Sequence, residues 1–256
     1  MDEPQALWQL DGLRVVQGDH VCVDRASLRL APRELVAVVG ANGAGKSSLI
    51  RAGLGLLPAS SGQAQVKGVD ITKLSARARA QMIAYLPQIR PLAWPMRVCD
   101  VVALGRFARA GAGLNAEDQD AINQALALTH LTPLAHRRSD TLSGGELART
   151  HLARALASQA PILVADEPTA ALDPAQALSV MTVVADFCAR GGAALVVVHD
   201  LNLALRFATR VLVMSQGQIL ADAPPRDALH SDLLEQAFCI KAELVDAGGL
   251  TMLAIR

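Results

Sequence analysis

Aromatic residues, closely spaced cysteines and long apolar runs are all scarce in this sequence. Aromatics make up only 3% of the 256 residues and hydrophobic residues 52%, so the core must rest on Leu, Val, Ile and Ala. The 4 cysteines lack Cys-x-x-Cys spacing and the 6 histidines are unclustered, which argues against disulfides and a structural metal site. No run of about 18 consecutive apolar residues occurs, so we expect no membrane-spanning helix.

An excess of charge of either sign is also missing. Lys plus Arg and Asp plus Glu are both 24, which gives a formal net charge of +0 at pH 7. A protein that binds nucleic acid by charge alone has a basic surplus, so we expect no nucleic-acid partner. Residues 1–4 contain no basic region followed by an apolar stretch, which predicts that no signal peptide is present.

A glycine-rich segment at residues 40–48 is the most specific motif of the chain. It follows an apolar run, precedes a helical pattern and reads Gly-x-x-x-x-Gly-Lys-Ser. This pattern is typical of a phosphate-binding loop, in which glycines let backbone N–H groups turn toward phosphates at a helix start. We expect Lys46 to reach the β- and γ-phosphates and Ser47 to bind Mg²⁺. The predicted nucleotide-binding residues of this loop are Gly40, Ala41, Asn42, Gly43, Ala44, Gly45, Lys46, Ser47 and Ser48.

Apolar runs that alternate with helical patterns predict an α/β fold. Strands are expected at 8–16, 21–30, 35–39, 64–67, 82–86, 162–165 and 193–198, and helices at 47–57, 75–82, 117–131 and about 146–158. This alternation favours a mostly parallel sheet covered on both faces, preceded by an antiparallel β lead-in.

A helical segment divides the single domain predicted for residues 1–256. Residues 1–88 and 159–256 are expected to form a catalytic α/β core, and residues 89–158 an inserted helical subdomain. Residues 210–256 read as two short strands, a helix near 226–238 and a strand-like ending, and this pattern assigns them no chemistry.

Acidic, imidazole and amide side chains follow three of the predicted strands. The carboxyl ends of parallel strands share one edge with the phosphate-binding loop, so these side chains should face the same Mg-nucleotide. We expect Asp166 to hold Mg²⁺ and Glu167 to act as general base on the attacking water. His199 would contact the γ-phosphate or orient the water, and Gln88 would ligate the metal and sense the γ-phosphate. The alternative interpretation is that all four are ordinary turn residues at strand exits.

A second glycine motif, Leu142-Ser143-Gly144-Gly145-Glu146, precedes a predicted helix. A serine hydroxyl and backbone N–H groups at a helix start form an anion-binding cradle, although an N-cap serine before a loop glycine pair is the simpler interpretation. One phosphate-binding loop and one further cradle in the same chain suggest that the cradle serves the nucleotide of a second copy. The motif therefore predicts a homodimer.

The combined motifs resemble the ATP-binding subunit of an ABC transporter over almost the whole chain. In this resemblance residues 40–48 match the Walker A loop, Gln88 the Q-loop, 142–146 the signature with Glu146 where Gln is commonest, 162–167 the Walker B strand, 171–173 the D-loop and His199 the switch histidine. It implies the ABC ATPase fold, with two subunits that sandwich two ATP molecules. Each ATP would contact one phosphate-binding loop and the opposite Ser143, Gly144 and Gly145, and Asp173 would couple the two sites.

The same resemblance implies partners and a location. The helical insert would dock on integral membrane permease subunits, which this chain lacks, and a substrate-binding protein would take part indirectly. The chain would then lie peripherally at the cytoplasmic face of the inner membrane.

Two further segments resemble importers of iron chelates such as ferric siderophores, haem and cobalamin. They are residues 91–106, which include Trp94, and residues 199–202. Trp94 would either fill a loop core or contact the membrane subunit. Zinc and manganese importers share part of this pattern, and an exporter ATPase or a soluble ABC ATPase of an assembly system stays open. One departure is Gln17, which stands where the family usually places an aromatic residue that stacks on adenine; His20 or an apolar face is the nearest alternative.

Overall fold

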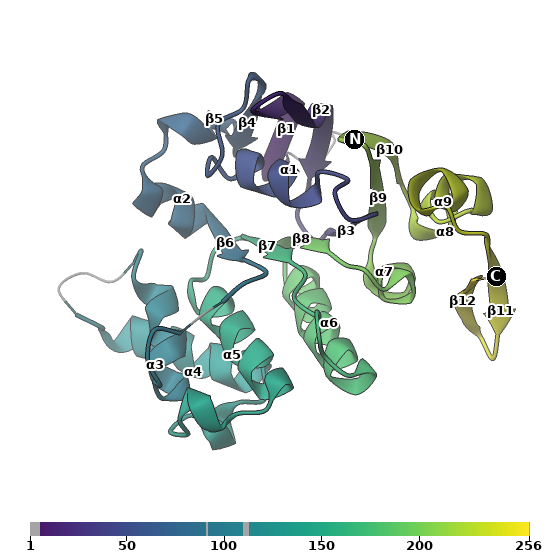
Figure 1. Cartoon of the computed structure of the whole chain (residues 1–256). Helices are drawn as coiled ribbons and strands as arrows, with labels where there is room; N and C mark the ends of the chain where they lie inside the picture. The colour runs from purple at the N-terminus through teal and green to yellow at the C-terminus, as the bar shows by residue number, and fades with distance from the viewer. Residues whose placement is uncertain (1–5, 91, 110–112, 256) are drawn as a thin grey trace.

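Three β-sheets and a group of helices make up the fold in the computed structural model, which describes residues 6–90, 92–109 and 113–255 (Figure 1). The expectation for residues 1–4 and position 91 of the importer-like segment lie outside these ranges. Among the described residues, no helix combines the length and the apolar character that a membrane crossing requires.

The central sheet has six strands in the order β10-β9-β3-β8-β7-β6. They are β3 (Leu35–Gly40), β6 (Ile83–Leu86), β7 (Ile162–Asp166), β8 (Ala193–Val197), β9 (Arg210–Ser215) and β10 (Gln218–Ala223). All neighbours pair in parallel except β9 and β10, which form an antiparallel hairpin at one edge. The predicted α/β fold with a mostly parallel sheet is therefore confirmed.

Alternating side chains of β3 fill two different cores. Leu35, Ala37 and Val39 pack with α6 (Pro174–Ala189) and α7 (Leu201–Phe207), whereas Val36 and Val38 pack with α1 (Lys46–Gly53). Figure 1 shows these helices on opposite faces of the sheet. Each fully buried Val or Leu contributes about 1.5–3 kcal/mol. Burial on both faces explains why this strand is a continuous apolar run.

A four-stranded antiparallel sheet covers α1 on the outside. Its order is β2-β1-β4-β5, with β1 (Trp8–Gln17), β2 (His20–Leu30), β4 (Ser61–Val66) and β5 (Val69–Asp70). The Trp8 indole donates a hydrogen bond to the Gly53 carbonyl at 3.1 Å, and a Cβ at Gly53 would lie 2.6 Å from the indole ring. Glycine at this position thus lets the helix lie against the sheet.

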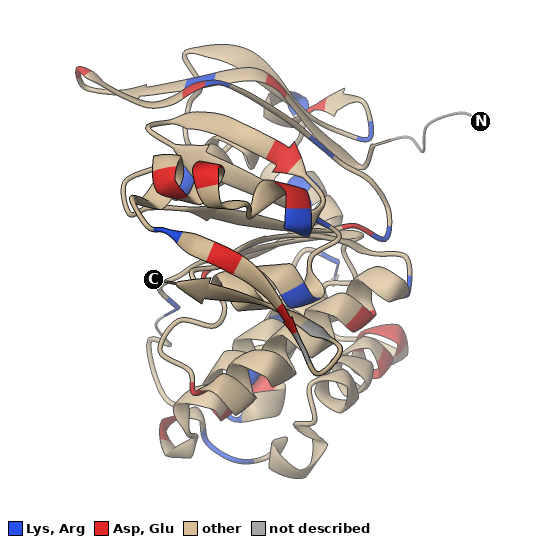
Figure 2. Ribbon diagram, turned by 90° about the vertical axis from the view of Figure 1, so that its right-hand side faces the viewer, with Lys and Arg blue, Asp and Glu red and all other residues tan. Residues whose placement is uncertain are grey.

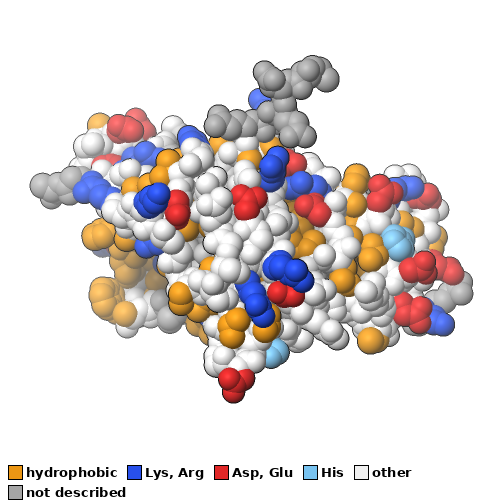
Figure 3. Space-filling model, turned by 90° about the horizontal axis from the view of Figure 1, so that it is seen from above, with side chains coloured by type: hydrophobic (Ala, Val, Ile, Leu, Met, Phe, Trp, Pro, Cys, Tyr) orange, Lys and Arg blue, Asp and Glu red, His pale blue; other side chains and the backbone are white. Residues whose placement is uncertain are grey.

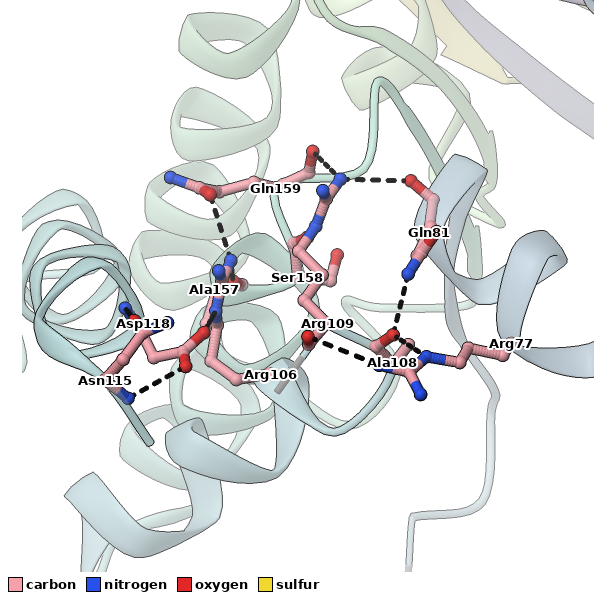
Figure 4. A network of polar contacts seen from close by, with 10 residues as sticks. All are labelled: Arg77, Gln81, Arg106, Ala108, Arg109, Asn115, Asp118, Ala157, Ser158 and Gln159. Carbon is pink, nitrogen blue, oxygen red and sulfur yellow. Dashed lines mark hydrogen bonds and ion pairs between the residues drawn. The ribbon is translucent and has the colours of Figure 1, made fainter. Parts of the chain in front are cut away.

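The helices α3 (Val98–Ala103), α4 (Ala116–Leu128) and α5 (Gly144–Ala157) share a separate apolar cluster that includes Val98, Val102, Ile122 and Leu126. The buried Arg106 guanidinium donates to the Asp118 carboxylate at 2.7 Å, to the Ala157 carbonyl at 3.0 Å and to the Gln159 side chain at 2.9 Å (Figure 4). Figure 4 also shows Arg109 bridging this group to Gln81 of α2 (Ala76–Met82), at 3.2 Å.

Three predicted helices differ from the observed ones. The helix expected at 117–131 ends at Leu128, ahead of His130 with its left-handed φ of 55°. The helix expected at 47–57 ends at Gly53, because Gly55 adopts a left-handed φ of 66° that stops the helix. The helix expected near 226–238 is two short helices, α8 (Pro225–Ala228) and α9 (Ser231–Phe238). Extended backbone at His230, with ψ of 160°, separates them.

A hairpin of β11 (Ala242–Ala247) and β12 (Leu250–Ile255) ends the described chain. The Asn202 side chain of α7 holds β12, since its Oδ1 accepts from the Leu253 backbone N–H at 2.7 Å. In the views of Figures 2 and 3, acidic and basic residues are interspersed over the elements and not gathered by sign, in keeping with the balanced charge of the sequence.

Candidate nucleotide site

The phosphate-binding loop lies between the end of β3 and the first turn of α1. Gly43 and Gly45 adopt left-handed φ angles of 82° and 96°, and a Cβ at Gly45 would collide with the Cys22 carbonyl oxygen of β2. Only glycine meets both conditions without strain. The Lys46 ammonium donates to the carbonyls of Gly40 and Ala41 at 2.7 and 2.9 Å, so the loop curls around its own lysine.

Lys46 is a buried cation, with 5% of its surface exposed. Burial lowers the pKa of its ammonium group, while the negative charges of Glu167 and Asp166 act in the opposite direction. The site therefore presents a positive charge and the N–H groups of a helix start, with two acidic residues close by.

Glu167 is the centre of a three-residue group at the carboxyl ends of β6, β7 and β8. Its Oε1 lies 2.7 Å from His199 Nε2, and its Oε2 accepts from the Gln88 amide at 2.6 Å. Glu167 adopts a left-handed φ of 53°, which is a strained conformation for a residue with a side chain. The structure thus brings together the three residues that the sequence predicts as catalytic.

Asp166 lies beside the phosphate-binding loop and is 1% exposed. Burial raises the pKa of its carboxyl, against a hydrogen bond from Ser47 and the charges of Arg51 and Lys46. Among the described residues its Oδ1 has no hydrogen-bond partner. A buried carboxylate oxygen with an unused lone pair next to a serine hydroxyl is a donor set that suits Mg²⁺, which binds through few protein oxygens.

A cavity of about 520 Å³ connects the phosphate-binding loop with the group around Glu167, and Asp166 is not part of its lining. It is lined by residues 42–48 of the loop and α1, by Gln88, Glu167 and His199, and by His20 and Cys22 of β2. Of the predicted site residues, Gly40 and Ala41 instead hold Lys46 through their carbonyls, and Gln17 is not in the lining. Cys22 was not predicted from the sequence, because no signal near it shows that β2 approaches the loop.

The signature segment lies outside this cavity. Ser143 caps α5: its hydroxyl accepts from the Glu146 N–H at 3.3 Å, and the Glu146 carboxylate accepts from the Ser143 N–H at 2.7 Å. This capping box explains why Glu is accepted at position 146. Ser143, Gly144 and Gly145 do not line the cavity. Asp173 also lies outside it and caps α6 by accepting from the Gln176 N–H at 2.9 Å.

A larger cavity of about 830 Å³ lies next to the first one. It borders Glu167 and His199, but most of its wall is apolar and includes Leu172, Leu178 and Met252. It has neither the glycine-rich loop nor the buried lysine. The smaller cavity is therefore the candidate site for a phosphorylated ligand.

The sequence matches known proteins over most of its length. Residues 23–170 match a family model described as "ABC transporter". A hemin import ATP-binding protein of Nocardia farcinica is 41% identical over 224 residues, which cover 88% of this chain and 78% of that protein. Another protein of that name, from Burkholderia thailandensis, is 38% identical and covers 92% of this chain and 94% of that protein.

Solved structures show the same fold. An inward-facing metal-chelate type ABC transporter chain aligns with a TM-score of 0.85 at 23% identity, over 98% of this chain and 97% of that chain. A dimeric bacterial ABC transporter cassette aligns with a TM-score of 0.74 at 26% identity, over 86% and 99%. These findings confirm the predicted ABC ATPase fold and the resemblance to ATP-binding subunits of the iron-chelate and haem importer group. The chain therefore belongs to the ABC transporter family.

Proposed function

We propose that this chain hydrolyses ATP in the cavity that the phosphate-binding loop lines. It would thereby power a membrane importer whose cargo is haem or a related iron chelate. The observation that carries the hydrolytic part is the carboxylate of Glu167, held by His199 and Gln88 in the same cavity as the phosphate-binding loop. The cargo rests on the relatives, which are named for hemin import.

ATP would bind with its triphosphate on the loop, where the N–H groups of residues 43–47 and the Lys46 ammonium face the anion. A water between Glu167 and the γ-phosphate would attack phosphorus. A new P–O bond forms, the bond from the γ-phosphorus to the β–γ bridging oxygen breaks, and ADP leaves with that oxygen. The Glu167 carboxylate accepts the proton that the water loses, which gives inorganic phosphate.

The neighbours of Glu167 would set its orientation. His199 holds one carboxylate oxygen and would turn toward the γ-phosphate, while the Gln88 amide holds the other. Ser47 and Asp166 would hold Mg²⁺, with Gln88 close by, and a bound Mg²⁺ neutralises charge on the β- and γ-phosphates.

The working unit would be a homodimer on permease subunits. Ser143 and Gly144 are exposed and lie outside their own chain's cavity, so a second copy would present them to the nucleotide. Asp173 would couple the two sites, and a substrate-binding protein would deliver cargo to the permease. The chain would then lie peripherally at the cytoplasmic face of the inner membrane. A cassette of similar fold is described as dimeric, which supports the first of these proposals.

The experiment that tests hydrolysis compares Glu167→Gln with the unaltered chain. The amide keeps the shape of the side chain but cannot accept the proton, so steady-state ATPase activity should fall by about 100-fold or more. ATP affinity, measured by equilibrium dialysis with Mg²⁺, should stay within about twofold. Near-normal ATPase activity in Glu167→Gln would contradict the assigned role. Stimulation of ATPase activity by haem in vesicles that contain the permease would test the cargo.

A further inference from the structure

The larger cavity, of about 830 Å³, holds no part of the nucleotide in the hydrolysis described above. Its wall comes from three segments that are far apart in the sequence: residues between 169 and 178 with the start of α6, residues between 199 and 206 with α7, and residues between 249 and 252 of the β11–β12 hairpin. Small-molecule sites in proteins commonly have volumes of about 300–1,000 Å³. The cavity is therefore large enough for a whole organic ligand.

The polar side chains in this wall are mostly engaged within the chain. The Glu167 carboxylate is held by His199, and the Asp200 carboxylate caps α7 by accepting from the Asn202 N–H at 2.8 Å. The Asn202 side chain in turn accepts from the backbone of β12. What the wall offers a ligand is therefore mainly apolar surface, to which the hairpin adds the 46%-exposed side chain of Met252.

Arg206 supplies a positive charge to the wall. It lies in the last turn of α7 and is exposed, so it stands where the cavity meets solvent. Its guanidinium carbon lies 5.5 Å from the centroid of the Phe207 ring, and within the described ranges no carboxylate forms an ion pair with it. Guanidinium groups bind carboxylates through paired hydrogen bonds. An apolar wall with this cation at its edge suits a ligand that has an apolar body and a carboxylate directed toward solvent.

The two cavities share Glu167 and His199 in their walls, whereas the phosphate-binding loop lines only the smaller one. In the hydrolysis proposed above, His199 leaves its place 2.7 Å from the Glu167 carboxylate and turns toward the γ-phosphate. A ligand that packs against the imidazole ring from the larger cavity would hinder this turn. Occupation of the larger cavity should therefore slow hydrolysis without displacing ATP from the loop.

We propose that the larger cavity binds haem, with the macrocycle against the apolar wall and a carboxylate on Arg206, and that bound haem slows ATP hydrolysis through His199. This inference rests on the proposed function, because haem is the cargo suggested by the relatives. Haem combines the two features that the wall requires, an apolar ring system and carboxylates on one edge. Imported haem, the product of transport, would thus restrain further import from the cytoplasmic side.

The first test measures binding of haem to the full chain without nucleotide, by the change in haem absorbance. Arg206→Gln removes the cation and should weaken haem binding by about fivefold. Arg33→Gln is the matched control, because Arg33 is exposed in the turn between β2 and β3, outside the cavity, and haem affinity should stay within about twofold. Unchanged affinity in Arg206→Gln, or an equal loss in Arg33→Gln, would overturn the proposal.

A charge pair at Met252 tests the same site from the hairpin. Met252→Glu and Met252→Lys remove the same apolar side chain and add charges of opposite sign. The glutamate should repel the haem carboxylates and weaken binding by about tenfold, whereas the lysine should keep haem affinity within about threefold. Equal affinities in the two variants would contradict a site that holds an anion beside the hairpin.

Two further ligands separate a porphyrin site from a site for any apolar carboxylate. Iron-free protoporphyrin has the same ring and carboxylates, so its affinity should lie within about threefold of that of haem. Oleate, a flexible apolar carboxylate, should displace protoporphyrin at least about tenfold less well than haem does, because its chain loses more freedom on binding. Displacement by oleate as effective as that by haem would contradict the assignment to a porphyrin.

The regulatory part is tested by steady-state ATPase kinetics with added haem. In the unaltered chain, saturating haem should lower kcat by about fivefold and leave KM for ATP within about twofold. Arg206→Gln should have the same activity without haem and require about fivefold more haem for half-inhibition. Competition between haem and ATP, or equal sensitivity of the two chains, would overturn the proposal. Failure of the proposed function looks different: the unaltered chain would then lack ATPase activity, while the absorbance titration would still report haem in the cavity.

Discussion

Two glycine motifs in this chain each open a helix, yet they are built differently. The loop at residues 40–48 surrounds a buried lysine, has acidic neighbours and lines a cavity of about 520 Å³. The motif at residues 143–145 has an exposed serine, which the Glu146 carboxylate already caps from within the same helix. The first motif lines a cavity of its own chain, whereas the second lies outside that cavity, and we propose that it serves the nucleotide of a second copy.

The largest expected difference in ATP binding comes from a Gly→Ala substitution made in each of the two motifs. Gly45→Ala places a Cβ on the Cys22 carbonyl and forces a residue with a side chain into a left-handed conformation. We expect it to weaken Mg-ATP binding by about 100-fold or more, because the loop can no longer cup the phosphates. Gly144→Ala is the matched control: a Cβ there meets open space, so binding to the isolated chain should not change. Equal losses of Mg-ATP affinity in both variants, measured by calorimetry, would contradict the proposed difference between the two motifs.

A negative charge at position 144 tests the same difference between the two motifs. Gly144→Asp also fits the open space around that position, so the isolated chain should fold and bind ATP normally. In a dimer, however, the carboxylate would face the phosphates of the second copy. We expect ATPase activity to fall on the order of 100-fold, comparable to losing a transition-state donor. Unimpaired turnover would show that this segment does not approach a nucleotide.

A smaller effect concerns a buried histidine in α5, the helix that the second glycine motif opens. The helix α5, opened by Ser143, buries His151 at 3% exposure, and burial with the nearby Arg154 and Arg90 charges lowers the pKa of its imidazole to about 4. Both ring nitrogens lack a hydrogen-bond partner among the described residues. Unfolding lets His151 bind a proton between its folded pKa and the ordinary 6.5, so stability is present above this window and falls as the pH drops through it.

The pH profile of stability measures this effect. At pH 5 the unfavourable proton linkage of His151 should cost about 2 kcal/mol of unfolding free energy relative to pH 7. His151→Phe, which fills similar space without a titratable group, should reduce that acid-dependent loss in urea denaturation. An identical pH profile in the variant would assign the acid sensitivity to other groups.

Sequence reasoning found the parts of the site whose signal is local. The phosphate-binding loop is nine consecutive residues, and Gln88, Glu167 and His199 each end an apolar run at the carboxyl edge of a parallel sheet, where topology brings them together. The sequence also suggested that Ser143 to Gly145 serve a second copy, and in the structure these residues lie outside the cavity of their own chain.

The features that sequence reasoning missed depend on contacts between distant segments. Cys22 belongs to the cavity because glycines at positions 45 and 217 let β2 approach the loop, and nothing near Cys22 signals this. The break at His230 between α8 and α9 is instead a local change of backbone conformation, in a segment whose residues are typical of one helix. The division of the chain into a core and a helical subdomain stays a prediction.

We propose that each ATP contacts the phosphate-binding loop of one chain and Ser143 to Gly145 of the other. The most direct test of this proposal mixes two inactive chains. Lys46→Ala lacks a working phosphate-binding loop but keeps its signature, whereas Gly144→Asp has the opposite defect. In a mixed dimer the intact loop of one chain meets the intact signature of the other, so an equal mixture should regain up to about a quarter of the unaltered ATPase activity. A mixture no more active than the mean of the two separate variants would contradict the account.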